Sequence, residues 1–215
     1  MTIIEELIAL GQEIATDGFV QGAGGNLSYR EDEQLLVSRS GVWLGRLTPA
    51  DFLPVALDEP REQLLARDPR PTSETSMHQV AYRGRPEARF IIHAHPPNAL
   101  CLGMLGWGLP AMTPDSYLRL GALVPLIPYI TPTTQALADA IEAEIRRAPA
   151  LLLQNHGVLV TGRTLDEARV RLRLLEEQAG IYLRAKAISP AGPRIFTTAD
   201  MAALDEMTGG KYRYS

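Results

Sequence analysis

The chain is short of several features that mark special classes of protein. One cysteine, Cys101, excludes an intrachain disulfide framework among 215 residues. No apolar run reaches the roughly 18 residues of a membrane span, and the N-terminus carries acidic residues instead of a basic, then apolar, signal. The net charge is -4, and no cluster of Lys and Arg is present. We therefore expect a cytoplasmic protein that binds neither a membrane nor nucleic acid.

The composition is that of an ordinary globular protein. Hydrophobic residues make up 46% of the chain and charged residues 21%, which excludes disordered and fibrous classes. A chain of 215 residues is long enough to bury one substantial core without disulfide bonds or a structural metal ion. We expect a single domain over residues 1–215, with a C-terminal tail from about residue 190.

The hydrophobic pattern predicts helices and strands that alternate along the chain. An apolar strand over 34–41 follows the glycine-rich loop "QGAGGNLSYR", and Ser73 is the predicted cap of the next helix. The longest predicted helix has Thr164 and Glu167 as a capping box. Further helices are predicted at 3–16, 96–105, 133–148 and 198–207, and further strands at 89–95, 123–130 and 150–162.

These elements indicate an α/β fold. Prolines break the strand over 123–130, which favours an edge or a bend. The stretch "LLLQNHGVLV" reads as two short strands joined by a turn at "NHG". Both features favour an antiparallel or mixed sheet over a doubly wound parallel one.

The histidines are few, and three of them follow apolar strands. His93 and His95 in "RFIIHAHPPN" are two residues apart, so in a strand both rings point to one face and can chelate a metal ion. An equally good interpretation is one packed ring and one ring in a loop. His156 in "LLLQNHGVL" likewise follows an apolar strand, and it supplies a third imidazole. His78 has helical spacing beside apolar residues, and we predict a structural role for it.

Glu74 and the glycine loop each allow two interpretations. Glu74, in "RPTSETSMH", is either an acid favoured by a helix dipole or a proton-transferring group near a metal ion. "GAGGN" is either a tight turn or a loop whose amides approach a phosphate, with Asn26 as a side-chain donor. Neither pattern is specific when taken alone.

The ordered set "GGNLS", "SRSG", "PTSE", "HAHPP" and "QNHG" resembles the class II aldolase/adducin family from about residue 3 to about residue 190, most closely its L-fuculose-1-phosphate aldolase-like zinc enzymes. The resemblance implies a three-layer α/β/α fold around a central, mostly antiparallel sheet. It also implies a homotetramer with sites between subunits and one divalent metal ion, zinc or alternatively manganese or cobalt.

The resemblance also implies roles for individual residues. His93, His95 and His156 resemble the metal ligands, and Glu74 resembles the acid that donates and accepts a proton beside the metal. The residues that resemble a phosphate pocket are Gly25, Asn26, Ser40, Gly41, Thr72 and Ser73. Tyr117 and Tyr212 are the candidate tyrosines that complete the site, with Asp115 and Tyr214 as alternatives.

The implied activity is that of a class II, metal-dependent aldehyde-lyase. Such an enzyme cleaves a ketose 1-phosphate to dihydroxyacetone phosphate and an aldehyde through a zinc-stabilised enediolate, and it needs no Schiff-base lysine. Alternatives on the same site are a sugar-phosphate 4-epimerase, a methylthioribulose-1-phosphate dehydratase and a decarboxylase of a phosphorylated oxo-acid. A non-catalytic interaction domain like that of adducin is less favoured because the implied ligands and Glu74 are present.

Overall fold

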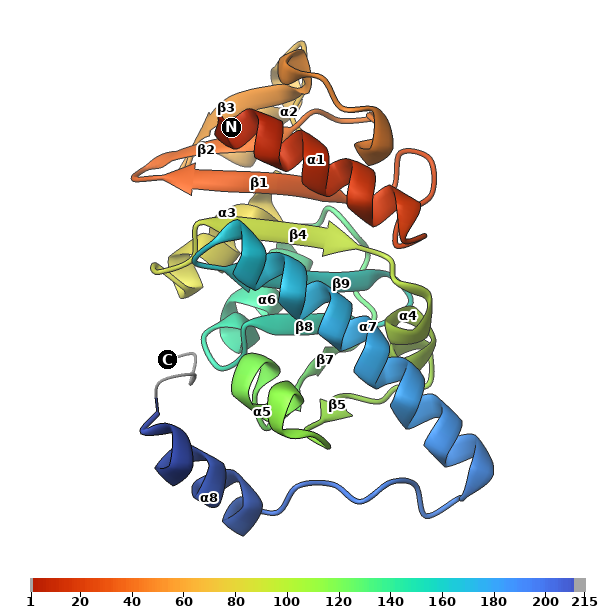
Figure 1. Cartoon of the computed structure of the whole chain (residues 1–215). Helices are drawn as coiled ribbons and strands as arrows, with labels where there is room; N and C mark the ends of the chain where they lie inside the picture. Colours follow the sequence, from red (N-terminus) through yellow and green to blue (C-terminus); the bar gives the residue numbers. More distant parts are fainter. Residues whose placement is uncertain (1, 211–215) are drawn as a thin grey trace.

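Strands near the middle of the chain form the centre of one mixed sheet. A computed structural model of the chain describes residues 2–210, and within them the sheet has seven strands in the order β3-β2-β1-β4-β9-β8-β7 (Figure 1). Every neighbouring pair is antiparallel except β7 with β8. The strands are β1 (Asn26–Glu31), β2 (Gln34–Ser38), β3 (Phe52–Ala56), β4 (Phe90–Ala94), β7 (Leu126–Ile127), β8 (Ala150–Leu153) and β9 (Gly157–Gly162).

Helices and two short strands complete the described chain. A separate two-stranded pair consists of β5 (Leu109–Pro110) and β6 (Leu123–Val124). The α-helices are α1 (Ile3–Thr16), α2 (Arg61–Ala66), α3 (Thr75–Gly84), α4 (Pro97–Met104), α5 (Pro114–Leu120), α6 (Gln135–Ile145), α7 (Leu165–Ile188) and α8 (Thr198–Thr208). Two 3-10 turns are η1 (Leu44–Arg46) and η2 (Pro49–Asp51).

Helices cover both faces of the sheet because its central strands are apolar on both sides. All five residues of β4 are buried, and successive side chains of a strand point to opposite faces. Ile92 packs in a cluster with α1, α4 and α7, whereas Ile91 packs in a second cluster with α3 and α6. In Figure 1, α1 and α7 cross the near face of the sheet, with α3 and α6 behind it.

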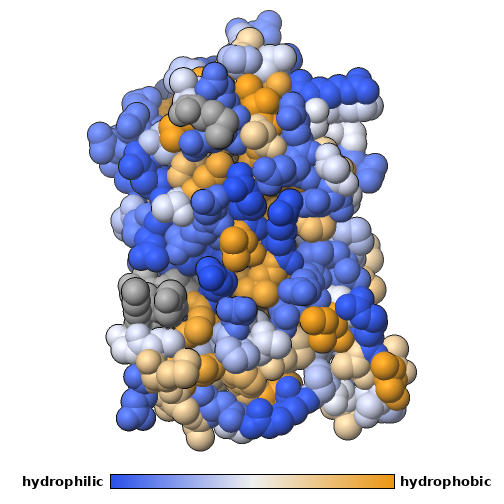
Figure 2. Space-filling view, viewed as in Figure 1, coloured by the Kyte–Doolittle hydropathy of each residue, from blue (hydrophilic) through white to orange (hydrophobic). Residues whose placement is uncertain are grey.

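Most of the predicted elements are confirmed, including the α/β class and the mixed, mostly antiparallel sheet. The helix over 3–16 is α1, and the proline-broken strand over 123–130 forms as two short strands, β6 in the separate pair and β7 at the edge of the main sheet. The pair around "NHG" is the hairpin of β8 and β9. The described helices include none that is both long enough and apolar enough to cross a membrane. Figure 2 shows mostly hydrophilic residues on the viewed face, with separate hydrophobic patches.

Three local predictions were wrong. The segment from Asn26 is strand β1, because its side chains continue the buried ladder once the glycines end. Ser73 does not cap α3, since Glu74 occupies the N-cap position, without a side-chain cap bond. Only half of the predicted capping box forms on α7: Thr164 accepts from the amide of Glu167, whereas the Glu167 carboxylate accepts from the amide of Arg163.

A buried carboxylate joins α7 to the start of α4. Glu176 Oε1 accepts from the Asn98 amide at 2.9 Å and from Asn98 Nδ2 at 2.7 Å, and Oε2 accepts from the Ala99 amide at 2.9 Å. Free amides at a helix start need such acceptors. Because α4 begins two residues after His95, this contact also fixes the chain that follows His95.

We expect Glu176→Ala to lower the free energy of unfolding by about 2 kcal/mol, since it leaves buried amides without an acceptor. Urea denaturation would measure the change. Glu177→Ala is the matched control, because Glu177 is the exposed neighbour on the same helix. Equal losses in the two variants would contradict the capping role of Glu176.

Candidate active site

Strand ends bring three histidines together. His93 belongs to β4 and pairs with Leu159 of β9, and His95 follows the end of β4. His156 lies in the turn between β8 and β9, where Asn155 adopts a positive φ of 55°. Gly157 follows, and a Cβ there would lie 2.4 Å from the Ala94 carbonyl oxygen and 2.5 Å from His95 Cδ2. The hairpin can approach β4 this closely only because position 157 has no side chain.

The three imidazoles present ligand atoms to one point. The ligand nitrogens of His93, His95 and His156 all lie within 4.8 Å of one another. His93 Nδ1 donates to the Val158 carbonyl at 2.9 Å, which leaves the lone pair of Nε2 for the site. The Nε2 atoms of His93 and His95 are 3.1 Å apart. Such a cluster has the donor set of a three-histidine metal site.

The carboxylate of Glu74 lies against two of these rings. Glu74 precedes α3, and its Oε1 is 3.1 Å from His156 Nε2 while its Oε2 is 3.2 Å from His93 Nε2. Asn26 Nδ2 donates to Oε2 at 2.8 Å. The structure therefore brings together the predicted ligands and the predicted acid.

Burial controls the charge state of the histidines. It lowers the pKa of His93, and together with the neighbouring rings it lowers the pKa of His95 to about 4, so both are neutral at neutral pH. Burial opposes the charged form of Glu74, but His93, His156 and the amide of Asn26 hold the pKa of this carboxyl below its usual range. An ionised carboxylate beside neutral imidazoles is a favourable surrounding for a cation.

The residues present fit a divalent metal ion. Two buried atoms at the site, Glu74 Oε1 and His156 Nδ1, have no hydrogen-bond partner among the described residues. Buried polar atoms are normally satisfied, so Oε1 in particular fits a group that the protein binds. His93, His95 and His156 would hold the ion, which leaves a fourth position for a ligand.

A cavity of about 160 Å³ opens beside these residues. It is lined by Ala23, Gly24, Gly25, Asn26, Arg39, Ser40, Gly41, Val42, Thr72, Ser73, Glu74, His95 and His156. All six predicted phosphate-pocket residues are among them. His93 is fully buried behind the lining.

Backbone contacts join the two loops that carry the hydroxyl groups of this cavity. Arg39 forms a β-bridge with Pro71. The Ser40 amide donates to the Arg70 carbonyl at 2.9 Å, and the Thr72 amide donates to the Ser38 carbonyl at 3.0 Å. The Ser40 and Thr72 loops therefore form one rigid wall.

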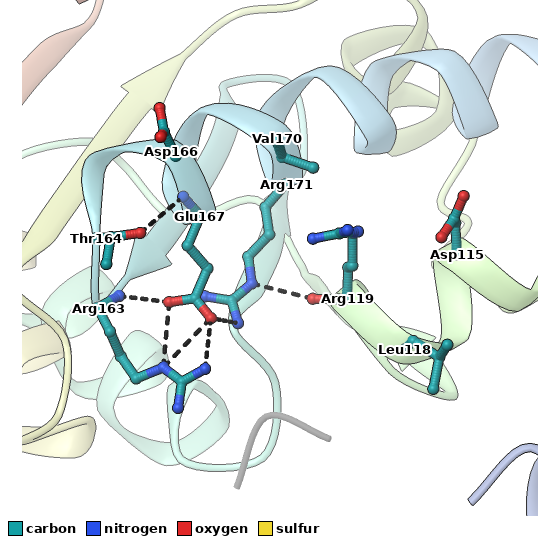
Figure 3. Close-up of a pocket in the computed structure, with 9 residues that line it drawn as sticks. All are labelled: Asp115, Leu118, Arg119, Arg163, Thr164, Asp166, Glu167, Val170 and Arg171. Carbon is teal, nitrogen blue, oxygen red and sulfur yellow. Dashed lines mark hydrogen bonds and ion pairs between the residues drawn. The ribbon is translucent and has the colours of Figure 1, made fainter. Parts of the chain in front are cut away.

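The predicted tyrosines do not join this cavity among the described residues. Tyr117 is buried on α5, where its hydroxyl donates to Asp205 Oδ2 of α8 at 2.9 Å. Asp115, the alternative on the same helix, lines another cavity of about 640 Å³, opposite the start of α7 (Figure 3). Tyr212 and Tyr214 lie outside the described residues.

Sequence reasoning missed one charged residue of the site, Arg39. It is the only Lys or Arg that lines the cavity in the described chain, and Asp51 Oδ1 accepts from its Nε at 3.0 Å and its Nη2 at 2.7 Å. The motif "SRSG" contains Arg39, but only the hydroxyl and glycine next to it were assigned a role. The signal that marks Arg39 is its contact with Asp51, which lies twelve residues further along the chain and outside the motif.

Comparison with known proteins agrees with this arrangement. Residues 5–183 match the class II aldolase and adducin N-terminal domain. The chain belongs to the class II aldolase and adducin family. The resemblance seen in the sequence motifs is thereby confirmed.

Relatives in this family differ in their reactions. The chain is 33% identical to 5-deoxy-D-ribulose 1-phosphate aldolase of Bacillus thuringiensis, over 93% of this chain and 92% of that protein. It is 31% identical to 3-oxo-tetronate 4-phosphate decarboxylase of Haemophilus influenzae, over 96% of this chain and 97% of that one. Among solved structures, an L-fuculose 1-phosphate aldolase superposes with a TM-score of 0.84 at 26% identity, covering 96% of both chains.

We expect His95→Ala to lose bound metal, because two imidazoles hold a divalent ion much more weakly than three. Glu74→Gln should keep the metal, since the three histidines remain. Metal content per chain after dialysis, measured by mass spectrometry, would test both variants, with circular dichroism as a check of folding. Full metal content in His95→Ala would contradict the assignment.

Proposed function

We propose that the protein is a metal-dependent aldolase that cleaves a ketose 1-phosphate to dihydroxyacetone phosphate and an aldehyde. One observation carries the proposal: the carboxylate of Glu74 contacts His93 and His156 at the edge of the hydroxyl-lined cavity. The contact supports a role for Glu74 as an acid–base group between a bound metal ion and an anion in the cavity. The aldolase among the relatives supports the same reaction.

Zinc is the metal that this donor set favours, with manganese or cobalt as alternatives. When bound, a divalent cation supplies the positive charge that stabilises an enediolate. His93, His95 and His156 would hold it, and the lowered pKa values of His93 and His95 keep those two rings neutral for that purpose. No lysine lines the cavity in the described part of the chain, which agrees with a reaction that needs no Schiff base.

Glu74 would exchange a proton with C3 of the substrate. When the C3–C4 bond of the ketose breaks, the C4 hydroxyl loses its proton and becomes the aldehyde, and the bonding electrons move into the enediolate of C2 and C3. Protonated Glu74 then donates to C3 and completes dihydroxyacetone phosphate. In the reverse direction Glu74 accepts that proton, and its lowered pKa keeps it in the ionised form that this step needs. Tyr117 and Tyr212 stay predictions for the group that serves the C4 hydroxyl.

The phosphate would bind at the wall formed by the Ser40 and Thr72 loops. Hydroxyl groups of Ser40, Thr72 and Ser73 and the amide of Asn26 line this part of the cavity. Gly25 allows the first loop to approach β4, because its φ is +75° and a Cβ there would lie 2.8 Å from the His93 carbonyl oxygen. Donors of this kind can hold a phosphate, and Arg39 adds a positive charge to the same lining.

Decarboxylation of a phosphorylated oxo-acid is the second candidate, and a relative with that activity is 31% identical to this chain. Loss of CO2 from a 3-oxo-tetronate 4-phosphate leaves electrons on the carbon beside the ketone, so the same enediolate and the same dihydroxyacetone phosphate result. The site needed is therefore the same. The second product, an aldehyde or CO2, separates the two reactions.

We also propose a homotetramer with sites between subunits. Exposed apolar side chains of Met104, Leu105, Trp107 and Leu123 support this part of the proposal. Gly103 precedes Met104, and a Cβ on Gly103 would lie 3.8 Å from the Cα of Gln154, two residues before His156. Gly108 follows Trp107, and a Cβ on Gly108 would lie 3.1 Å from Leu123. The apolar side chains therefore lie near the turn that carries His156. The mass of the protein in solution, from light scattering, tests it, and a monomer would contradict it.

We expect the zinc-loaded protein to release dihydroxyacetone phosphate and an aldehyde from at least one ketose 1-phosphate, and Glu74→Gln to lose about 100-fold or more in kcat. A panel of ketose 1-phosphates and a 3-oxo-tetronate 4-phosphate, with separate detection of aldehyde and CO2, would measure both reactions. CO2 without aldehyde would favour the decarboxylase. Normal turnover by Glu74→Gln would overturn the acid–base role in either reaction.

We expect Arg39→Gln to weaken competitive inhibition by inorganic phosphate by about 1.4- to 5-fold, since partly exposed charge pairs contribute roughly 0.2 to 1 kcal/mol. The effect is modest because Asp51 already neutralises part of the charge. Arg46→Gln is the matched control: it removes an exposed arginine that does not line the cavity. An unchanged inhibition constant in Arg39→Gln would show that Arg39 does not face the anion.

A further inference from the structure

His78 is the one described histidine outside the candidate metal cluster, and it is fully buried. It lies on α3, one helical turn after Glu74. Both ring nitrogens have partners: Nδ1 is 2.7 Å from Ser28 Oγ, and Nε2 is 2.5 Å from Asn26 Oδ1. Asn26 in turn donates from Nδ2 to Glu74 Oε2 at 2.8 Å. A continuous chain of hydrogen bonds therefore runs from the core to the predicted acid.

The donors in this chain can point in only one direction. A carboxylate oxygen only accepts, so the NH2 end of Asn26 must face Glu74 and the amide oxygen must face His78. Because an amide oxygen also only accepts, His78 Nε2 must carry the ring proton. Its Nδ1 is then an acceptor, and the Ser28 hydroxyl donates to it. Burial lowers the pKa of His78 to about 3, which agrees with a neutral ring that has one N–H.

The arrangement determines what Asn26 can offer the cavity. Its side-chain nitrogen has two hydrogens, of which Glu74 takes one, and Asn26 lines the cavity. If the amide were rotated by half a turn, its oxygen would face the Glu74 carboxylate and two acceptors would oppose each other. Backbone pairing cannot prevent this rotation: β1 places Asn26 opposite His93 but does not fix the end of its side chain. The N–H of His78 Nε2, which faces Asn26 Oδ1, opposes this rotation from the other end of the amide.

We propose that His78 is a positioning residue, which holds the amide of Asn26 so that its N–H groups face Glu74 and the phosphate side of the cavity. This inference rests on the proposed role of Glu74 in proton transfer. His78 is not a predicted metal ligand and does not itself line the cavity, so its side chain acts on the cavity through its contact with Asn26. If His78 were a core histidine that only fills space, its replacement would change the stability of the protein without a specific change in proton transfer.

The first test is independent of any activity. In zinc-loaded protein labelled with 15N-histidine, long-range NMR correlations identify which ring nitrogen of His78 carries the proton. We expect the proton on Nε2. A proton on Nδ1 would make Nε2 an acceptor, which is incompatible with the Asn26 orientation, and would overturn the proposal.

The second test measures proton transfer by the exchange of a carbon-bound hydrogen of dihydroxyacetone phosphate with D2O. We expect His78→Leu to slow this exchange by about 10- to 100-fold, because a freed Asn26 amide would lose its hydrogen bond to the charged Glu74 carboxylate. Zinc content should be unchanged. His78→Gln, whose amide offers a donor and an acceptor, should recover most of the rate.

Gln79→Leu is the matched control on the same helix. Gln79 is buried and donates to the carbonyls of Ala56 and Glu59, at 3.0 Å each, so its loss disturbs α3 without touching Asn26. Equal rates in His78→Leu and Gln79→Leu would overturn the positioning role. An absence of exchange in the wild-type protein would instead count against the proposed function, and the NMR result would still decide the orientation of His78.

Discussion

Strand β4 pairs with β1 on one side and with β9 on the other, and this double pairing is the constraint on which the site depends. The β1 ladder sets Asn26 opposite His93, and the β9 ladder sets Leu159 opposite the same residue. A shift of one residue in either ladder would turn His93 to the opposite face. The two clusters on opposite faces of the sheet keep both registers in place, because they bury alternate residues of β4. The packing of the core and the geometry of the site therefore depend on the same strand register.

The candidate site separates two tasks. Three histidines and one carboxylate form a deep part that can hold a cation, and hydroxyl and amide groups form a shallower part that can hold an anion. Glu74 lies where these parts meet. Breakage of a carbon–carbon bond beside a ketone leaves the same enediolate whether an aldehyde or CO2 departs. This explains how relatives with similar chains can be an aldolase and a decarboxylase. The residues that receive the departing group distinguish the reactions.

Much of this arrangement could be predicted from sequence because its signals are local. His93 and His95 share a face through strand periodicity alone, and the turn at His156 is marked by Asn155 and Gly157. Other features depend on distant contacts. Asn26 begins a strand because it pairs with β4, although the preceding glycines indicate a loop. Arg39 turns to the cavity while Asp51, twelve residues away, holds it. The link from His78 to Asn26 spans 52 positions, so no short motif contains it.

Gly157 has a consequence for how members of this family can be compared. Any side chain there would have to overlap the Ala94 backbone and the His95 ring, so the hairpin would move away and separate His156 from its partners. A chain could then retain every ligand histidine and still be unable to hold an ion. The presence of the ligands is thus an incomplete signature of activity. A glycine at this position is a second requirement, beside the ligands, for the arrangement of histidines in this chain.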